Sequence, residues 1–79
     1  MYRVGTAVRI AQGLVILRSD PDGDLEGRNA IGTMVLDDSL ETVGRVVDVF
    51  GPVDRPYFAV TPDDDVHVPA LVGSRLYAR

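Results

Sequence analysis

The sequence has no cysteine, no lysine and only one histidine, His67. Without cysteine the chain forms no disulfide, offers no thiolate to a metal and has no thiol nucleophile, so nothing implies an oxidising compartment. Long apolar runs are also missing, since none approaches the roughly 20 residues that cross a bilayer. Arg3 and Arg9 interrupt the apolar pattern at the N-terminus, which is unlike a signal peptide. We therefore expect a soluble, cytoplasmic protein with no membrane contact.

The chain also lacks the residue patterns of an enzyme site. Its 79 residues correspond to a single domain, residues 1–79, whose small core a partner surface could extend. His67 has no orienting partner or neighbouring nucleophile in the sequence, and we expect it to be a surface residue. Ser19, Ser39 and Ser74 fall in predicted turns without a nucleophile motif. We expect no catalysis, no cofactor and no small-molecule substrate.

Acidic residues outnumber basic ones. Ten aspartates and two glutamates against eight arginines give a net charge of −4 and a pI of about 4.6. A chain of this charge repels phosphate, so we expect no free-standing nucleic-acid binding, and inside an RNA particle another subunit would hold the RNA. An Asp-rich, Lys-free surface is expected where concentrated salt screens charge repulsion, and it predicts a halophilic, archaeal source. A GC-rich genome, which favours Arg over Lys, is the alternative.

Two acidic segments are candidates for metal sites. Residues 22–27 (DGDLEG) imitate the start of a calcium loop, with acids at the first, third and fifth positions and then glycine. The twelfth position, which should be a bidentate glutamate, is Thr33, and no helices flank the loop. The consecutive aspartates 63–65 diverge rather than converge. We interpret both segments as solvated turns and predict no metal site.

Short β-like runs separated by turn residues dominate the sequence. In the first run, residues 2, 4, 6, 8 and 10 are largely apolar and should share one buried face. Gln12-Gly13 then predicts a tight turn, and residues 69–73 predict one helical turn. The predicted strands span residues 2–11, 14–17, 30–36, 43–50, 57–61 and 74–79. This pattern predicts an all-β fold, a small six-stranded antiparallel β-barrel.

The segment 44–57 (GRVVDVFGPVDRPY) differs from the rest of the chain. A β-branched strand runs into Phe50-Gly51-Pro52-Val53, and Pro56-Tyr57 follows. The two prolines restrict the backbone, so the loop should be stiff. Stiff apolar groups lose little entropy on binding, which favours a protein-docking surface for the loop as a unit. The alternative is that Phe50 and Tyr57 plug one end of the barrel.

This segment resembles the signature of the Gar-type subunit of H/ACA ribonucleoproteins, which is close to G-x-V-x-D-x-F-G-P-V-x-x-P-Y. The resemblance covers roughly residues 30–79. The positions that match the signature are Gly44, Val46, Asp48, Phe50, Gly51, Pro52, Val53, Pro56 and Tyr57.

The resemblance implies a six-stranded barrel related to the translation-factor β-barrel. It also implies a non-catalytic subunit that binds the catalytic domain of the pseudouridine synthase, called dyskerin in animals, and lies remote from the guide RNA. Such a subunit promotes loading and release of substrate RNA during rRNA pseudouridylation, a step of ribosome biogenesis. The chain has no glycine-arginine-rich tail, which fits an archaeal form of the family.

We predict that six residues lie at the synthase interface or support it: Phe50, Gly51, Pro52, Val53, Pro56 and Tyr57. Two alternatives remain at this point. One is a Naf-type assembly factor, which shares the barrel and much of the signature but is usually much longer. The other is a barrel that binds RNA directly, with Tyr57 and Phe58 stacking on bases beside Arg45 and Arg55.

Overall fold

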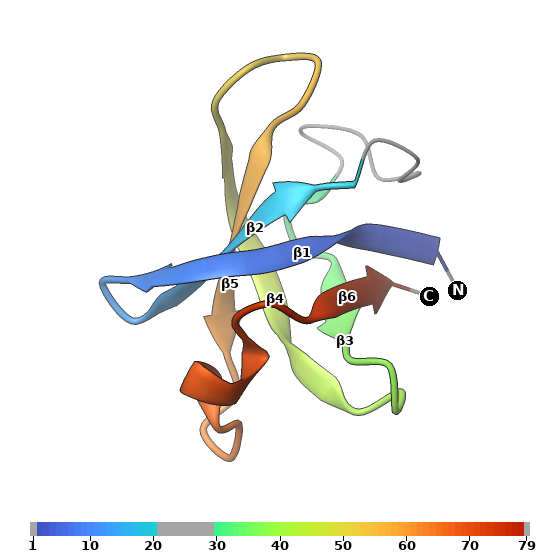
Figure 1. Ribbon diagram of the computed structural model, residues 1–79, viewed down its shortest axis with the longest axis vertical. Helices are drawn as coiled ribbons and strands as arrows, with labels where there is room; N and C mark the ends of the chain where they lie inside the picture. The colour runs from blue at the N-terminus through green and yellow to red at the C-terminus, as the bar shows by residue number, and fades with distance from the viewer. Residues whose placement is uncertain (1, 21–29, 79) are drawn as a thin grey trace.

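The computed structural model describes residues 2–20 and 30–78, and they form a closed antiparallel barrel (Figure 1). Around the barrel the strands follow the order β1-β2-β5-β4-β3-β6, and β6 closes on β1. A single-turn 3-10 helix, η2 (Val68–Leu71), precedes β6. The fold class predicted from the sequence is confirmed. The strands are β1 (Tyr2–Ala11), β2 (Leu14–Ser19), β3 (Met34–Leu36), β4 (Thr42–Phe50), β5 (Tyr57–Pro62) and β6 (Arg75–Ala78).

Turn residues set the connections between these strands. Gln12 and Gly13 have φ values of 52° and 77°, the geometry of a two-residue hairpin turn that matches the strand twist. The predicted turn between β1 and β2 is therefore confirmed. Between β3 and β4, the Asp37 carboxylate accepts hydrogen bonds from the backbone N–H groups of Ser39 and Glu41, at 2.8 and 3.0 Å. In the part of the chain described, no helix is long and apolar enough to cross a membrane.

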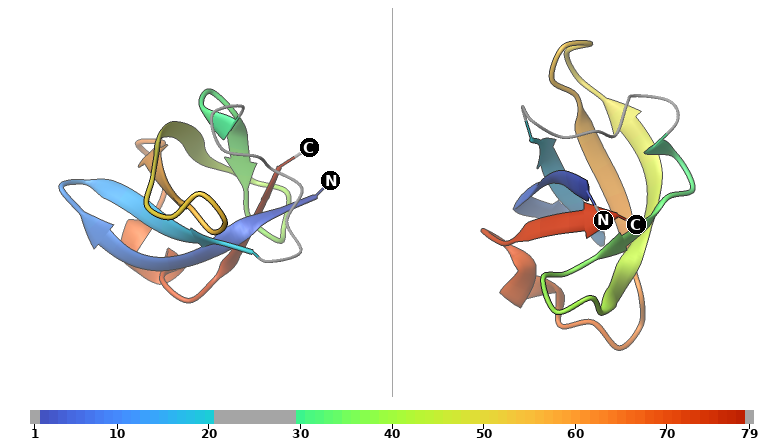
Figure 2. Two further views of the ribbon diagram at one scale, coloured as in Figure 1. Left: turned by 90° about the horizontal axis from the view of Figure 1, so that it is seen from above. Right: turned by 90° about the vertical axis from the view of Figure 1, so that its right-hand side faces the viewer.

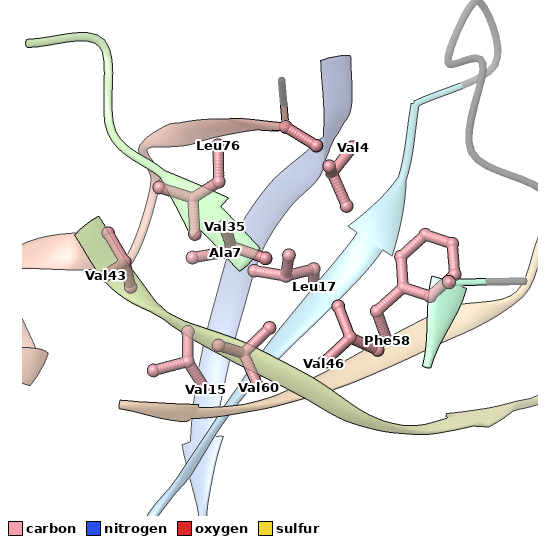
Figure 3. Close-up of a cluster of buried hydrophobic side chains, with 12 residues drawn as sticks. Val4, Ala7, Val15, Leu17, Val35, Val43, Val46, Phe58, Val60 and Leu76 are labelled. Carbon is pink, nitrogen blue, oxygen red and sulfur yellow. The ribbon is translucent and has the colours of Figure 1, made fainter. Parts of the chain in front are cut away.

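The core lies inside the barrel (Figure 3), and half of its members among the described residues are valines, joined by one aromatic side chain, Phe58. Phe58 is fully buried against β-branched and leucine side chains. It therefore has no face for a nucleic-acid base, and its suggested role in direct RNA stacking is wrong. The core members are Val4, Ala7, Val15, Leu17, Ala30, Val35, Val43, Val46, Phe58, Val60, Leu76 and Ala78.

The predicted apolar face of β1 is wrong beyond Val4. The pairing register of β1 shifts between Arg3 and Gly5 against β6, and again between Ala7 and Arg9 against β2. Because each bulge inserts a residue, Ala7 enters the core and Val8 turns outward, 37% exposed. The backbone of Ala7 is held by residues 73–74, which bond to its N–H and C=O at 2.9 and 2.7 Å.

The third strand is shorter than predicted. Only residues 34–36 form β3, because the backbone of residues 30–33 makes a turn, with Gly32 at a φ of 91°. This turn still pairs with β4, since Gly32 N–H donates to the Val46 carbonyl at 2.8 Å and Val46 N–H donates to the Thr33 carbonyl at 2.9 Å. The segment 30–33 therefore contacts the expected neighbour without being a regular strand.

Other boundaries differ by one or two residues. β2 runs to Ser19, which is buried at the end of the strand rather than placed in a turn. β4 and β5 each gain one residue, and β6 spans 75–78. The segment 22–27, which imitates a calcium loop, lies outside the described residues.

Candidate interaction surfaces

The connection between β4 and β5 projects from one end of the barrel (Figures 1 and 2). Phe50 and Tyr57 form the last residue pair of these two strands. Their neighbours Val49 and Phe58 pack in the core, so Phe50 and Tyr57 face outward. The two rings stack with centroids 5.6 Å apart and planes inclined by 19°. Phe50 stays 39% exposed, and the alternative in which both rings plug the barrel is therefore wrong.

Backbone geometry makes the loop between the two rings tight. Gly51 has a φ of 91°, a conformation that side chains disfavour, and a Cβ there would lie 2.9 Å from Cδ2 of Tyr57. Arg55 N–H donates to the Pro52 carbonyl at 3.2 Å and closes a turn. Within this turn Val53 is 96% exposed. The loop therefore presents one apolar side chain almost entirely to solvent.

The base of the loop is attached to β2. Ser19 N–H donates to the Pro56 carbonyl at 3.2 Å, which extends the pairing of β2 and β5 beyond Arg18 and Tyr57. The Arg18 guanidinium carbon lies 5.9 Å from the centroid of the Tyr57 ring. A row of three side chains thus crosses β2, β5 and β4. The Arg18 guanidinium faces the Tyr57 ring, and the Phe50 ring stacks with the Tyr57 ring.

Beside this row lies a groove of about 410 Å³, the arginine groove, which sequence reasoning missed. Thr6 of β1 pairs with Arg18 of β2 on one side and with Arg75 of β6 on the other. Three strands therefore bring these side chains to one outer face. The groove is lined by Arg3, Thr6, Val8, Arg18, Ser19, Asp20, Arg55 and Arg75.

Along the sequence the arginines are interleaved with acidic residues, and the direct RNA-binding alternative groups only Arg45 with Arg55. The structure separates that pair, because Arg45 lies outside the groove on β4. The groove forms because β6 closes on β1 and because both β1 pairings have the observed register. The spacing of residues along the chain indicates neither the closure nor the register, so no local signal in the sequence identifies the groove.

A second hollow, of about 670 Å³, is lined by residues of the β3–β4 turn and of the segment before η2. These two segments lie at the end of the barrel away from the projecting loop (Figure 1). Four carboxylates line it, together with His67, which is exposed as predicted. Across residues 2–20 and 30–78, no group of three or more acidic, histidine or cysteine side chains is placed to hold a metal ion. The carboxylates belong to Asp37, Glu41, Asp63 and Asp65.

The sequence model of one protein family, described as the Gar1/Naf1 RNA binding region, matches residues 1–79. The chain belongs to the Gar1/Naf1 family. A solved structure described as that of the Gar1 domain of Naf1 has a similar fold. Its TM-score is 0.67 at 14% sequence identity, over 98% of this chain and 80% of that chain. Comparison with curated proteins gives no significant match.

Membership of the Gar1/Naf1 family supports a role associated with an H/ACA ribonucleoprotein, as a component or as an assembly factor. The family is one of non-catalytic ribonucleoprotein and assembly proteins. The resemblance found in segment 44–57 is confirmed at the level of the family.

The Gar1/Naf1 signature has a structural half and an exposed half. Gly44 lies so close to the Thr61 carbonyl that a Cβ would overlap it, and Val46 packs in the core. Asp48 follows a bulge in β4, and its carboxylate accepts a hydrogen bond from Val49 N–H at 2.8 Å. These positions fix the path of β4. The later positions, residues 50–57, shape the projecting loop, which is where the predicted interface residues gather.

Proposed function

We propose that this chain is the non-catalytic Gar-type subunit of an H/ACA guide-RNA pseudouridylation complex. It binds the catalytic domain of the dyskerin-like pseudouridine synthase through the loop of residues 50–57 and promotes loading and release of substrate RNA. This activity supports rRNA pseudouridylation and ribosome biogenesis in the cytoplasm of an archaeon. The single observation that carries the proposal is Val53, an apolar side chain 96% exposed on a loop braced at both ends.

The bracing favours docking on energetic grounds. Ordering a flexible side chain at an interface costs about 0.5–1.5 kcal/mol, and ordering a flexible loop costs more. Here the Phe50–Tyr57 stack and the Pro56–Ser19 hydrogen bond hold the loop before any partner arrives. Burying a fully exposed valine gains roughly 1.5–3 kcal/mol. Most of that gain is retained, so we expect Val53 to enter an apolar hollow on the synthase.

Mixing the chain with an archaeal pseudouridine synthase tests the proposal. We expect the wild type to coelute with the synthase on a sizing column and the Phe50→Ala/Val53→Asp variant to elute alone. Loss of a central contact should weaken Kd by at least about thirtyfold, measured by calorimetry. The matched control is Val72→Asp, which places the same charge at an apolar residue 45% exposed near η2. An unchanged complex with the double variant removes the loop from the interface.

A Naf-type assembly role would use the same barrel. The two roles differ in when the protein is bound, so copurification from a native lysate separates them. A component of the working complex is recovered with the synthase and mature guide RNA, whereas an assembly factor is not.

A second candidate function, direct contact with RNA, is favoured by the arginine groove and by the family description, which names RNA binding.

A further inference from the structure

We propose that the arginine groove binds an extended protein segment that carries several aspartate or glutamate side chains and an apolar residue. The groove is distinct from the proposed synthase contact, since Val53 and the two stacked rings of the projecting loop do not line it. It is formed mainly by the outer faces of β1, β2 and β6. A protein bound there would be a partner beyond the synthase, and its binding does not depend on the proposed docking.

The first support is the placement of the cations. Arg18 and Arg75 lie directly opposite Thr6 on its two neighbouring strands, so the three side chains point to the same outer face. Both arginines are exposed, and two strand spacings, about 10 Å, separate them. Alternate side chains of an extended segment lie about 7 Å apart on one face. The two long arginine side chains can therefore each reach a different carboxylate of one bound segment.

The second support is charge. Four guanidinium groups and one carboxylate line the groove among the described residues, which leaves a local charge of +3. The carboxylate is that of Asp20, whose Oδ2 lies 3.6 Å from Nη1 of Arg3, so the groove already holds one carboxylate of the chain itself. Across residues 2–20 and 30–78, Arg18, Arg55 and Arg75 form no ion pair. A carboxylate ligand would therefore meet these planar forks without displacing an existing partner.

The third support is a buried hydroxyl group. Ser19 is only 8% exposed, and its side chain lines the groove. Within the described parts of the chain, the Ser19 hydroxyl makes no hydrogen bond. Buried polar groups normally have a partner, so a hydroxyl of this kind among guanidinium groups indicates an acceptor oxygen on a ligand. The half-buried Thr6 adds a second hydroxyl to the same groove.

The fourth support distinguishes a protein segment from RNA, which charge alone does not. Among the described residues that line the groove, none is aromatic, so a bound nucleic acid would find no ring there on which to stack its bases. The apolar lining comes from Val8, which the bulge in β1 turns outward, 37% exposed. An aliphatic side chain packs against the aliphatic groups of a protein. Arginine clusters recognise acidic protein motifs, and Val8 adds a contact for an apolar neighbour within such a motif.

The test uses the full chain and a fluorescent peptide of about eight residues, long enough to cross the groove when extended. The peptide consists of aspartates around one central leucine. One matched peptide has asparagine in place of every aspartate, and a second has serine in place of the leucine. Anisotropy gives the affinity of each peptide at low salt and again at moderate salt, and a fluorescent oligouridylate is measured in parallel.

Charge variants of the chain locate the binding site. Arg18→Gln/Arg75→Gln removes two cations from the groove, and Arg9→Gln/Arg45→Gln removes two exposed cations outside it, so both variants have the same net charge. Thermal melts check that each variant folds. We expect the groove variant to bind the aspartate peptide at least about tenfold more weakly than the wild type, and the control variant to bind it as the wild type does.

A second pair of variants tests the apolar contact. Val8→Ser should weaken binding of the leucine-containing peptide at least about threefold, whereas Val47→Ser, an equally apolar and exposed position on β4 outside the groove, should not. Val8→Ser should leave the affinity for the peptide without leucine unchanged. A loss no greater with Val8→Ser than with Val47→Ser would overturn the assignment of a segment that contains an apolar residue.

The remaining outcomes separate this site from RNA binding and from synthase docking. Equal binding of the asparagine peptide, equal losses in both charge variants, or no peptide binding by the folded wild type would overturn the proposal. Tighter binding of the oligouridylate than of the aspartate peptide, lost in the groove variant, would assign the groove to RNA instead. Val53→Ser should bind the peptide as the wild type does, so failure of the synthase docking would leave the peptide result unaffected.

Discussion

Gly44 shows how a single position of the signature acts through packing. Strands β4 and β5 approach so closely there that the Thr61 carbonyl oxygen occupies the place of a side chain. Gly5 makes the same contact with the Arg18 carbonyl where β1 pairs with β2. In both cases the obstacle is backbone, which cannot move aside as a flexible side chain would. The glycine is therefore required by the sheet and not by any partner.

Replacing Gly44 with alanine should lower the free energy of unfolding by about 2–3 kcal/mol, because the added methyl group forces two strands apart. Gly13→Ala is the comparison, since a Cβ there meets nothing within 4 Å. It should cost only about 1–2 kcal/mol, for its positive φ. Urea unfolding of both variants measures the difference. If Gly13→Ala is the more damaging, close strand approach is not what selects glycine at position 44.

At the scale of the element, the end of the β4–β5 hairpin is stabilised by a side-chain contact as well as by its turn. Phe50 and Tyr57 stack directly across the strand pair, and Gly51 leaves room for the Tyr57 ring. Exposed rings in contact typically contribute about 0.5–1.5 kcal/mol beyond the area they bury. The contact therefore stabilises the part of the hairpin that carries the projecting loop.

A double-mutant cycle isolates this contribution. Phe50→Leu and Tyr57→Leu, alone and together, should give a coupling energy of about 0.5–1.5 kcal/mol in urea unfolding. The control cycle pairs Phe50→Leu with Tyr77→Leu on β6, where we expect coupling within about 0.3–0.5 kcal/mol of zero. A coupling near zero in the first cycle would show that the two rings are merely adjacent.

Most of the barrel was predictable because turn residues and apolar runs are local. Gln12-Gly13, and the prolines at positions 52 and 56, mark strand ends within a few residues of where they fall. The interior of β1 was not predictable in the same way. Its bulges depend on how Ala7 bonds to residues 73–74, a contact that joins two ends of the chain. Alternation alone therefore placed Val8 on the wrong face.

The same difference between local and long-range contacts explains why the projecting loop was predictable and the arginine groove was not. The projecting loop is one continuous segment, so its prolines and aromatic residues could be interpreted together from the sequence. The arginine groove takes residues from three strands and a loop, and Arg3 is far from Arg75 in the chain. Only the closed topology makes them neighbours. The composition, which is acidic overall, also gives no indication of a basic site.

Within residues 2–20 and 30–78, opposite charges gather at different places on the molecule. The arginine groove lies along β1 and near the projecting loop, whereas the second hollow gathers Asp37, Glu41, Asp63 and Asp65 at the other end. Like charges gathered in this way repel one another, which destabilises the folded chain when salt is low. This repulsion is the physical basis for proposing a halophilic source.

Raising the salt concentration should therefore stabilise the fold. We expect Tm to rise by about 5 °C, equivalent to roughly 1 kcal/mol, when thermal melts are moved from low to molar KCl. Asp63→Asn/Asp65→Asn removes two of the repelling charges and should reduce that rise. Asp48→Asn, which lies outside the hollow, is the control. A chain equally stable at low and high salt would contradict the halophilic hypothesis.

The uneven distribution of charge also affects how the molecule associates with charged partners. In the electric field of a polyanion, a protein with a positive face and a negative end becomes oriented before it makes contact. The groove and the adjacent loop would then face forward in most collisions, and fewer encounters would be lost to wrong orientations. Association would be fast at low ionic strength and slower as salt increases, while dissociation, which depends on the contacts themselves, would change less.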